Sequence, residues 1–182
     1  MGDNMAGFAT LSLPRSALVP NQSVSLKYAE VLKSDGSVDM AWCAEGAACK
    51  CSGINCANQT DTFIPGPPSA NENDDTSVEY TPTFTYHGFR YVQVEGLAKS
   101  YTPTTADLTG LFVHSAVRST GNVSFSHPVL DGVQKAIVQT QKSNLHFHPT
   151  DCPQREKRGW TGDGEQPCLL PPPAPARTLT LR

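Results

Sequence analysis

His148-Pro-Thr-Asp-Cys-Pro-Gln-Arg-Glu-Lys-Arg-Gly-Trp-Thr-Gly-Asp163 is the segment of this chain with the densest chemistry. Two aspartates, one glutamate, three basic residues and a tryptophan fall within its sixteen positions. Prolines and glycines set its backbone, and no helical or strand period runs through it. Such a segment contributes little to a core. It is suited to presenting polar groups and one aromatic face to a small polar ligand.

Upstream of this segment, apolar and polar residues alternate in the manner of β-strands. Residues 6–31 alternate on both sides of a Pro-containing turn, with Val24, Leu26 and Tyr28 set against polar neighbours. Aromatic residues alternate again over 84–94, beginning at Phe84. Residues 34–37 have the composition of a turn. These patterns predict antiparallel, sandwich-like β structure over residues 6–95.

The period changes near residue 126, where a helix is predicted. Ser126 is a helix-capping residue type, and Pro128 falls in the expected first turn. Leu130, Val133 and Ile137 then share one helical face, and the helix is expected to run to about Ser143. Strands followed by a helix predict two domains that meet within residues 96–125.

Composition excludes several classes of function. The formal net charge is −3, which argues against nucleic acid as a partner because phosphate binding needs a basic surface. No apolar stretch approaches the roughly 20 residues that span a bilayer, so no membrane partner is expected. The first residues lack the basic and apolar regions of a signal peptide. Three glycosylation sequons and a Cys-rich stretch still favour a secreted, lysosomal or vacuolar setting.

Residues 151–163 resemble the signature of the α-L-rhamnosidases, glycoside hydrolase family 78. That signature reads Asp-Cys-Pro-Gln-Arg, a variable residue, Glu-Arg, a variable residue, and Gly-Trp-Thr-Gly-Asp. Phe84-Thr-Tyr-His-Gly-Phe-Arg-Tyr-Val92 is similar to a strand of that family's β-domain. Shorter matches lie at 2–7, 26–32, 113–115 and 120–121. The resemblance therefore covers residues 2–163 in order.

The resemblance implies a mainly β fold, a partial concanavalin-like β-sandwich followed by the first helix of a truncated (α/α)6 barrel. The expected parts are an incomplete sandwich domain at 1–95, a connecting segment at 96–125 and the start of a six-hairpin catalytic domain at 126–163. Residues 164–182 hold five of the 15 prolines and are expected to form a divergent, disordered tail. The family's general base lies far downstream. We therefore expect this chain to be a gene fragment that is inactive alone.

The resemblance also implies an activity, the inverting hydrolysis of terminal α-L-rhamnose from a rhamnose-containing glycoside or oligosaccharide, with no cofactor and no metal. It places the general acid at Glu156 and sugar contacts at Asp151, Arg155, Trp160 and Asp163. A glutamate that stays protonated needs burial or a neighbouring carboxylate to raise its pKa. The two aspartates are expected to supply that negative field. The tryptophan is expected to pack on the apolar face of the sugar ring.

The chain departs from the signature at two positions. One residue is missing between Arg155 and Glu156, and Glu156 is aligned with the acid because its spacing to Trp160 and Asp163 is preserved. Lys157 stands where the family usually has arginine, which keeps the charge and loses a bidentate donor.

Structural interpretations stand beside these functional ones. Glu156 taken alone reads as a solvated loop carboxylate, Trp160 as a domain-packing anchor and Asp151 as a cap for the turn before Pro153. His146 and His148 could ligate a metal, although a place in the loop wall is favoured. For Tyr86 and His87, packing in the sandwich is favoured over a sugar platform.

The cysteines at 43, 49, 51 and 56 lack the paired Cys-x-x-Cys spacing of structural zinc sites, which favours disulfides over zinc. Two other functions also remain open: a non-catalytic carbohydrate-binding β-sandwich, and a truncated product without function. The truncated product would leave the apolar helix face, with Leu130, Val133 and Ile137, without a partner surface.

Overall fold

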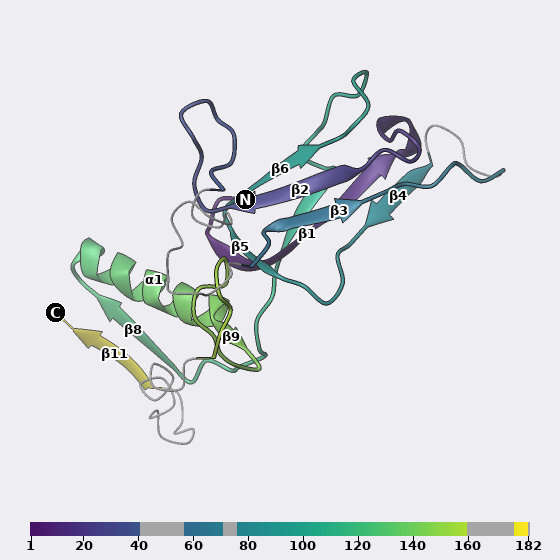
Figure 1. The fold of residues 1–182 in the computed structure, drawn as a ribbon. Helices are drawn as coiled ribbons and strands as arrows, with labels where there is room; N and C mark the ends of the chain where they lie inside the picture. Colours follow the sequence, from purple (N-terminus) through teal and green to yellow (C-terminus); the bar gives the residue numbers. More distant parts are fainter. Residues whose placement is uncertain (41–56, 71–75, 160–176, 182) are drawn as a thin grey trace.

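A computed structural model describes residues 1–40, 57–70, 76–159 and 177–181 of the chain. This part is mainly β, with a single α-helix, as the sequence predicts (Figure 1). Its elements are β1 (Met5–Pro14), the 3-10 turn η1 (Arg15–Ala17), β2 (Val24–Ala29), β3 (Thr60–Phe63), β4 (Ser77–Tyr80), β5 (His87–Phe89), β6 (Tyr91–Glu95), β7 (Leu108–Phe112), β8 (Gly121–Phe125), α1 (Pro128–Ser143), β9 (Leu145–His146), β10 (His148–Pro149) and β11 (Arg177–Leu181).

Two antiparallel sheets form a sandwich, and β1 is the central strand of the first sheet. Strands β4 and β5 pair with the two ends of β1 along one edge, while β7 pairs with its middle along the other edge. The second sheet has the order β3-β2-β6. Strands β5 and β6 belong to different sheets and are separated only by Arg90, so the chain crosses the sandwich at that residue. The predicted sandwich over 6–95 is therefore present, and β7 joins its first sheet from within 96–125.

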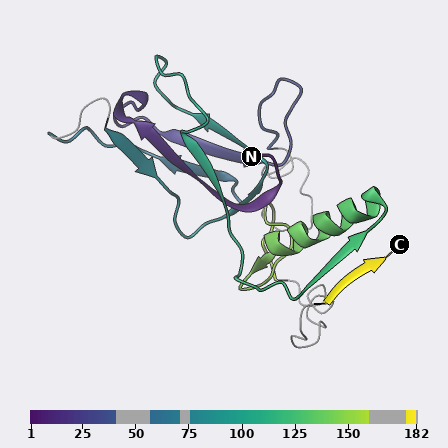
Figure 2. The same ribbon diagram turned by 180° about the vertical axis from the view of Figure 1, so that it is seen from behind.

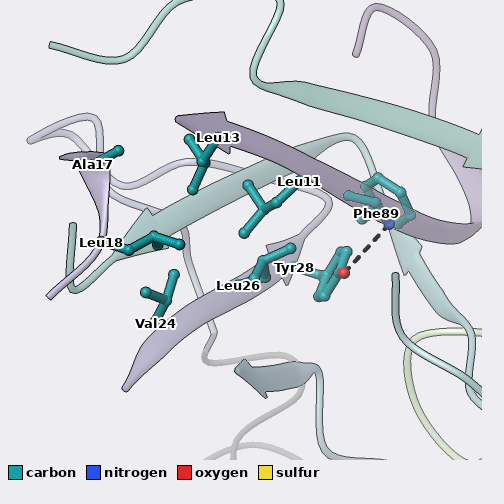
Figure 3. Packing of buried hydrophobic residues seen from close by; sticks show 9 residues of the cluster. Leu11, Leu13, Ala17, Leu18, Val24, Leu26, Tyr28 and Phe89 are labelled. Carbon is teal, nitrogen blue, oxygen red and sulfur yellow. Dashed lines mark hydrogen bonds between the residues drawn. The ribbon is translucent and has the colours of Figure 1, made fainter. Parts of the chain in front are cut away.

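The core lies between the inner faces of β1 and β2. Ala9, Leu11 and Leu13 of β1 are buried and face the buried side chains of β2 (Figure 3). The residues between them are partly exposed, so burial repeats every second residue, as it does in a strand with one buried face. Each such aliphatic side chain stabilises the fold by about 1.5–3 kcal/mol relative to leaving it in water.

Tyr28 joins the two sheets at the end of this core that lies nearest the helix. Its hydroxyl oxygen accepts a hydrogen bond of 3.3 Å from the backbone N–H of Ala9, which Figure 3 marks with a dashed line. Its ring stacks on His87 at 4.1 Å between centroids and meets Phe89 edge-on at 4.9 Å. Burial raises the pKa of the Tyr28 phenol. The hydroxyl therefore stays neutral and can serve as a fixed polar contact inside an apolar layer.

The aromatic alternation at 84–94 is not one strand. Phe84 is fully exposed and has a left-handed backbone with φ of 58°. A left-handed residue cannot continue a strand ladder, so β5 begins only at His87. The expectation of strand structure at residues 84–86 is wrong. The expectation that His87 packs inside the sandwich is confirmed, since its side chain is nearly inaccessible.

Helix α1 and the short strands around it form a second body at one end of the sandwich (Figures 1 and 2). The helix begins at Pro128 with His127 as the N-cap residue, so the expected cap at Ser126 is wrong by one residue. Instead, Asp131 of the first turn accepts a hydrogen bond from the Phe125 amide at 3.3 Å. The helix ends at Ser143, as predicted.

The apolar face that the sequence places on α1 is only partly covered. Leu130, Val133 and Ile137 are each about half exposed. On another side of the helix, the Gln139 amide donates to the Asn4 carbonyl oxygen at 3.2 Å and so ties α1 to the residues before β1.

The remaining sequence predictions meet the structure unevenly. Residues 177–181 belong to the segment 164–182 that is expected to form a divergent, disordered tail, and in the structure they form β11, which pairs in parallel with β8. The Cys-rich cluster at 43–56 lies outside the described residues. Within the described ranges, no helix has the length and apolar character needed to cross a membrane.

Replacing Leu26 by alanine tests the assigned core. Leu26 is fully buried, and a Leu→Ala change in such a position costs about 2–5 kcal/mol of unfolding free energy because a cavity remains. Leu111→Ala on β7 is the matched control, since Leu111 is 40% exposed, and it should cost much less. Urea unfolding of the two variants checks this, and equal losses would contradict the assigned core.

Candidate active site

The acidic segment folds as a closed loop directly after β10. An isolated bridge joins Thr150 to Gly159, and the Asp151 amide donates to the Arg158 carbonyl oxygen at 2.8 Å. The Thr150 amide donates to the Asn144 carbonyl oxygen at 2.8 Å, which ties the loop to the end of α1. These bonds hold residues 150–159 as one unit, called here the acidic loop.

Asp151, Cys152 and Glu156 meet inside the acidic loop. One polar atom of each lies within 4.8 Å of the others. The Cys152 amide and thiol both point at one carboxylate oxygen of Asp151, at 2.9 and 3.2 Å. The Glu156 side chain is only 4% exposed, so it is not a solvated loop carboxylate.

Arg155 forms a two-pronged ion pair with Glu156. Its Nε donates to one carboxylate oxygen and its Nη2 to the other, the second at 3.0 Å. Parallel hydrogen bonds of this kind are the strongest that a carboxylate makes with a side chain. A metal ion at the Asp151, Cys152 and Glu156 cluster would have to compete with both of them. Of the described residues, these three are the group whose ligand atoms lie close enough for a metal.

The pKa values of the two carboxyl groups of the cluster are shifted in opposite directions. The Arg155 fork lowers the pKa of Glu156 to about 2, more than burial opposes it. The hydrogen bond with Glu156 raises the pKa of Asp151, and burial adds to that rise. Of the two carboxyl groups, Asp151 is therefore the one that takes up a proton first as the pH falls, while Glu156 stays ionised. The sequence-based expectation that Asp151 raises the pKa of Glu156 is wrong, because the hydrogen bond from Asp151 lowers that pKa together with Arg155. Asp163, the other carboxylate expected to act on Glu156, lies outside the described residues.

The acidic loop rests on the β-sandwich. A Cβ atom at Gly88 of β5 would lie 2.7 Å from the Gln154 amide nitrogen and 3.1 Å from the carbonyl carbon of Pro153. The Ala57 amide donates to the Arg155 carbonyl oxygen at 2.6 Å. The Lys157 ammonium donates to the Tyr86 carbonyl oxygen. Contacts at Gly88, Ala57 and Tyr86 thus hold the loop from Pro153 to Lys157.

A buried polar group supports β5 beneath this contact. The ring nitrogens of His87 lie 3.0 Å from Gln59 Oε1 and 3.0 Å from both carboxylate oxygens of Asp61. The Gln59 amide also donates to the Gly88 carbonyl oxygen at 2.9 Å. Gln59 and Asp61 were not singled out from sequence, since their strand is short and follows the Cys-rich stretch. Only the histidine pointed to this group.

An open cavity of about 680 Å³ lies between α1 and the start of the sandwich, and the acidic loop forms part of its wall. Asp151, Cys152 and Gln154 line it from the loop side. Asn4, Glu30 and Gln139 contribute side chains from the opposite walls. Two members of the cluster, Asp151 and Cys152, therefore border this opening, while Glu156 lies behind them and does not line it.

The predicted site residues fall into two groups. Asp151, Arg155 and Glu156 are brought together as predicted, while Trp160 and Asp163 lie outside the described residues. His146 stacks on Tyr86 at 4.1 Å between ring centroids and His148 is exposed, so neither joins the metal-type cluster of the described loop.

A sandwich followed by one helix and an acidic loop is the arrangement of a concanavalin-like domain ahead of the start of a six-hairpin glycosidase domain, and two family models match the chain in this order. The model of the bacterial alpha-L-rhamnosidase concanavalin-like domain matches residues 1–114. The model of the six-hairpin glycosidase domain of the same proteins matches residues 118–169. The chain belongs to the bacterial α-L-rhamnosidase family.

Curated relatives and solved structures agree with this assignment. An alpha-L-rhamnosidase of Formosa agariphila is 32% identical over 163 residues, which are 89% of this chain and 15% of that protein. The structure of the Dictyoglumus thermophilum alpha-L-rhamnosidase has a TM-score of 0.73 at 30% identity, covering 92% of this chain and 16% of its own. The Streptomyces avermitilis alpha-L-rhamnosidase, solved in complex with L-rhamnose, has a TM-score of 0.64 at 31% identity over 89% of this chain. The chain spans 14% of that protein's length.

Gly88→Ala tests the contact between the loop and β5. The added methyl group would overlap the Gln154 backbone, and such overpacking costs about 1–3 kcal/mol. Gly132→Ala on α1 is the matched control, because a Cβ there meets nothing within 4 Å and alanine favours a helix by up to about 1 kcal/mol. Urea unfolding should show a loss for the first variant and a gain for the second. A neutral Gly88→Ala would mean that the loop does not lie on β5.

The Cys152 thiol provides a test of the cluster itself. Burial and the hydrogen bond to Asp151 raise its pKa to about 12, so at pH 8 it holds far less thiolate than a free cysteine with a pKa of about 8.5. Iodoacetamide should therefore alkylate Cys152 at least about 100-fold more slowly than in the urea-unfolded chain. Mass spectrometry of the peptide containing Cys152 gives the rate. Equal rates in the two states would refute the buried thiol.

Proposed function

We propose that the polypeptide carrying this chain is an α-L-rhamnosidase, which hydrolyses terminal α-L-rhamnose from a rhamnose-containing glycoside. The observation that supports it best is the acidic loop, in which Glu156 contacts Arg155 and lies close to Asp151, and Asp151 lines the neighbouring cavity. The relatives named above carry the activity in their names, and one was solved with L-rhamnose. In this proposal Glu156 is the general acid.

A general acid must hold a proton when it meets the glycosidic oxygen, and the loop contains a source for it. With no sugar bound, Arg155 keeps Glu156 ionised, and in this proposal Asp151, whose pKa is raised, carries the proton. If a sugar hydroxyl takes over the N–H groups of Arg155, Glu156 loses its ion pair and its pKa rises. The proton then passes along the hydrogen bond from Asp151 to Glu156. Glu156 donates it to the leaving oxygen, and the Asp151 carboxylate accepts a hydrogen bond from the sugar.

The same geometry excludes Asp151 as the base of an inverting reaction. Inverting glycosidases hold acid and base about 6.5–9.5 Å apart so that a water molecule fits between them. A carboxylate oxygen of Asp151 lies within 4.8 Å of one of Glu156. The base is therefore assigned to a carboxylate outside the acidic loop. Trp160 and Asp163 complete the proposal as the platform under the sugar ring and a second hydroxyl-binding carboxylate.

The activity test uses the full chain alone and the full chain joined to the rest of the helical domain of the Streptomyces relative. We expect hydrolysis of p-nitrophenyl α-L-rhamnoside by the joined form. Glu156→Gln should lower kcat by about 10²–10⁴-fold on an alkyl rhamnoside, whose leaving group needs a proton. The loss should be smaller on the p-nitrophenyl substrate, because nitrophenolate leaves without one.

Glu79→Gln on β4 is the matched control and should leave both rates unchanged. Equal losses on the two substrates would contradict the acid role of Glu156. Rhamnose binding without hydrolysis by either form would contradict the proposed hydrolase activity and favour a carbohydrate-binding module.

A further inference from the structure

Lys157 follows the acid directly, and its side chain leaves the loop in another direction. Glu156 faces Arg155 within the loop, whereas the Lys157 ammonium donates to the carbonyl oxygen of Tyr86 just before β5. The same ammonium lies 4.5 Å from the centre of the Tyr86 ring. A cation held over an aromatic face and bonded to a carbonyl is a fixed contact, not a solvated lysine.

Both the burial of the Lys157 ammonium and its backbone conformation oppose the contact with Tyr86 energetically. Burial lowers the pKa of Lys157, with the Asp61 carboxylate acting against that change. Lys157 also has a left-handed backbone with φ of 51°, which strains a residue other than glycine. Strained backbone persists only where surrounding contacts fix it. The contact with Tyr86 is the one that holds this side chain on the sandwich.

Tyr86 is itself held by the helical part of the chain. Its ring stacks on His146, which follows α1, with 20° between the ring planes. Its hydroxyl bonds the Thr150 side chain at the start of the acidic loop. Lys157, Tyr86 and His146 thus link the end of the loop, the sandwich and the end of the helix in one stack.

We propose that Lys157 is a positioning residue for Glu156: seated on Tyr86, its ammonium fixes the turn that keeps the acid beside Arg155 and Asp151. The inference rests on the proposed function for its kinetic consequence, while the placement of the loop is independent of it. Arginine can replace Lys157 in this role because a guanidinium also stacks on an aromatic ring.

The placement is tested on the full chain by the alkylation rate of Cys152, which shares the cluster with Glu156. Lys157→Met keeps the length of the side chain and removes its charge, and it should raise the rate about tenfold or more as the loop loosens. Tyr86→Leu should do the same, whereas Lys157→Arg should restore slow alkylation. Lys33→Met, in an exposed turn, is the matched control. Hydrogen exchange of the β2 amides must stay unchanged, so that general unfolding does not account for the effect.

The kinetic consequence is measured on the joined form used for the activity test. Lys157→Met should lower kcat about 10–100-fold with KM nearly unchanged, because a misplaced acid slows the chemical step more than it weakens binding. Lys157→Arg should recover most of kcat. Cys152 alkylation and kcat in Lys157→Met that both match those of Lys33→Met would overturn the inference. A joined form without activity would refute the proposed function, and the alkylation rates would then decide the placement alone.

Discussion

The close approach of two backbones at Gly88 determines how the rest of the site is arranged. Since β5 has no side chain there, Pro153 and Gln154 lie directly on the strand, at a distance that a methyl group would not permit. This contact sets where Arg155 and Glu156 stand relative to the sandwich. It also explains the buried polar group below β5, since Gln59 and His87 hold the strand in the position that the loop requires. The sandwich is thus one wall of the site as well as a neighbouring domain.

Much of the sandwich is predictable because its signal is local and repeated. Val24, Leu26 and Tyr28 alternate with polar neighbours, and each is buried. The helix end at Ser143 follows from periodicity in the same way. The strand prediction at Phe84 fails because aromatic alternation does not reveal a left-handed backbone, which depends on neighbours distant in sequence. The helix start differs by one residue because His127, which makes no side-chain capping bond, is the N-cap residue, and Asp131 of the first turn accepts instead from the Phe125 amide ahead of the helix.

For the candidate site, the sequence indicates which residues lie close together but not their charge states. Asp151, Arg155 and Glu156 are near one another in the sequence, so their presence in one loop follows from their spacing. The charges of Asp151 and Glu156 depend on which side chain Arg155 contacts, and that contact is set by the three-dimensional structure of the loop. Tyr86 and His146 illustrate the same limit. Each looks ordinary in its own strand pattern, and their stacking appears only when the loop and the sandwich meet.

The ion pair between Arg155 and Glu156 joins residues that are neighbours in the chain. Two adjacent side chains can reach each other in the denatured ensemble as well as in the native state, so the pair favours folding less than a long-range bridge would. Its main effect in the folded loop is on the charge of Glu156, whose pKa it lowers. The pair also depends on the length of this stretch, because the family signature has one more residue between the arginine and the glutamate, and adding it here would separate the two partners along the chain. Substitution elsewhere in the loop would leave their adjacency intact.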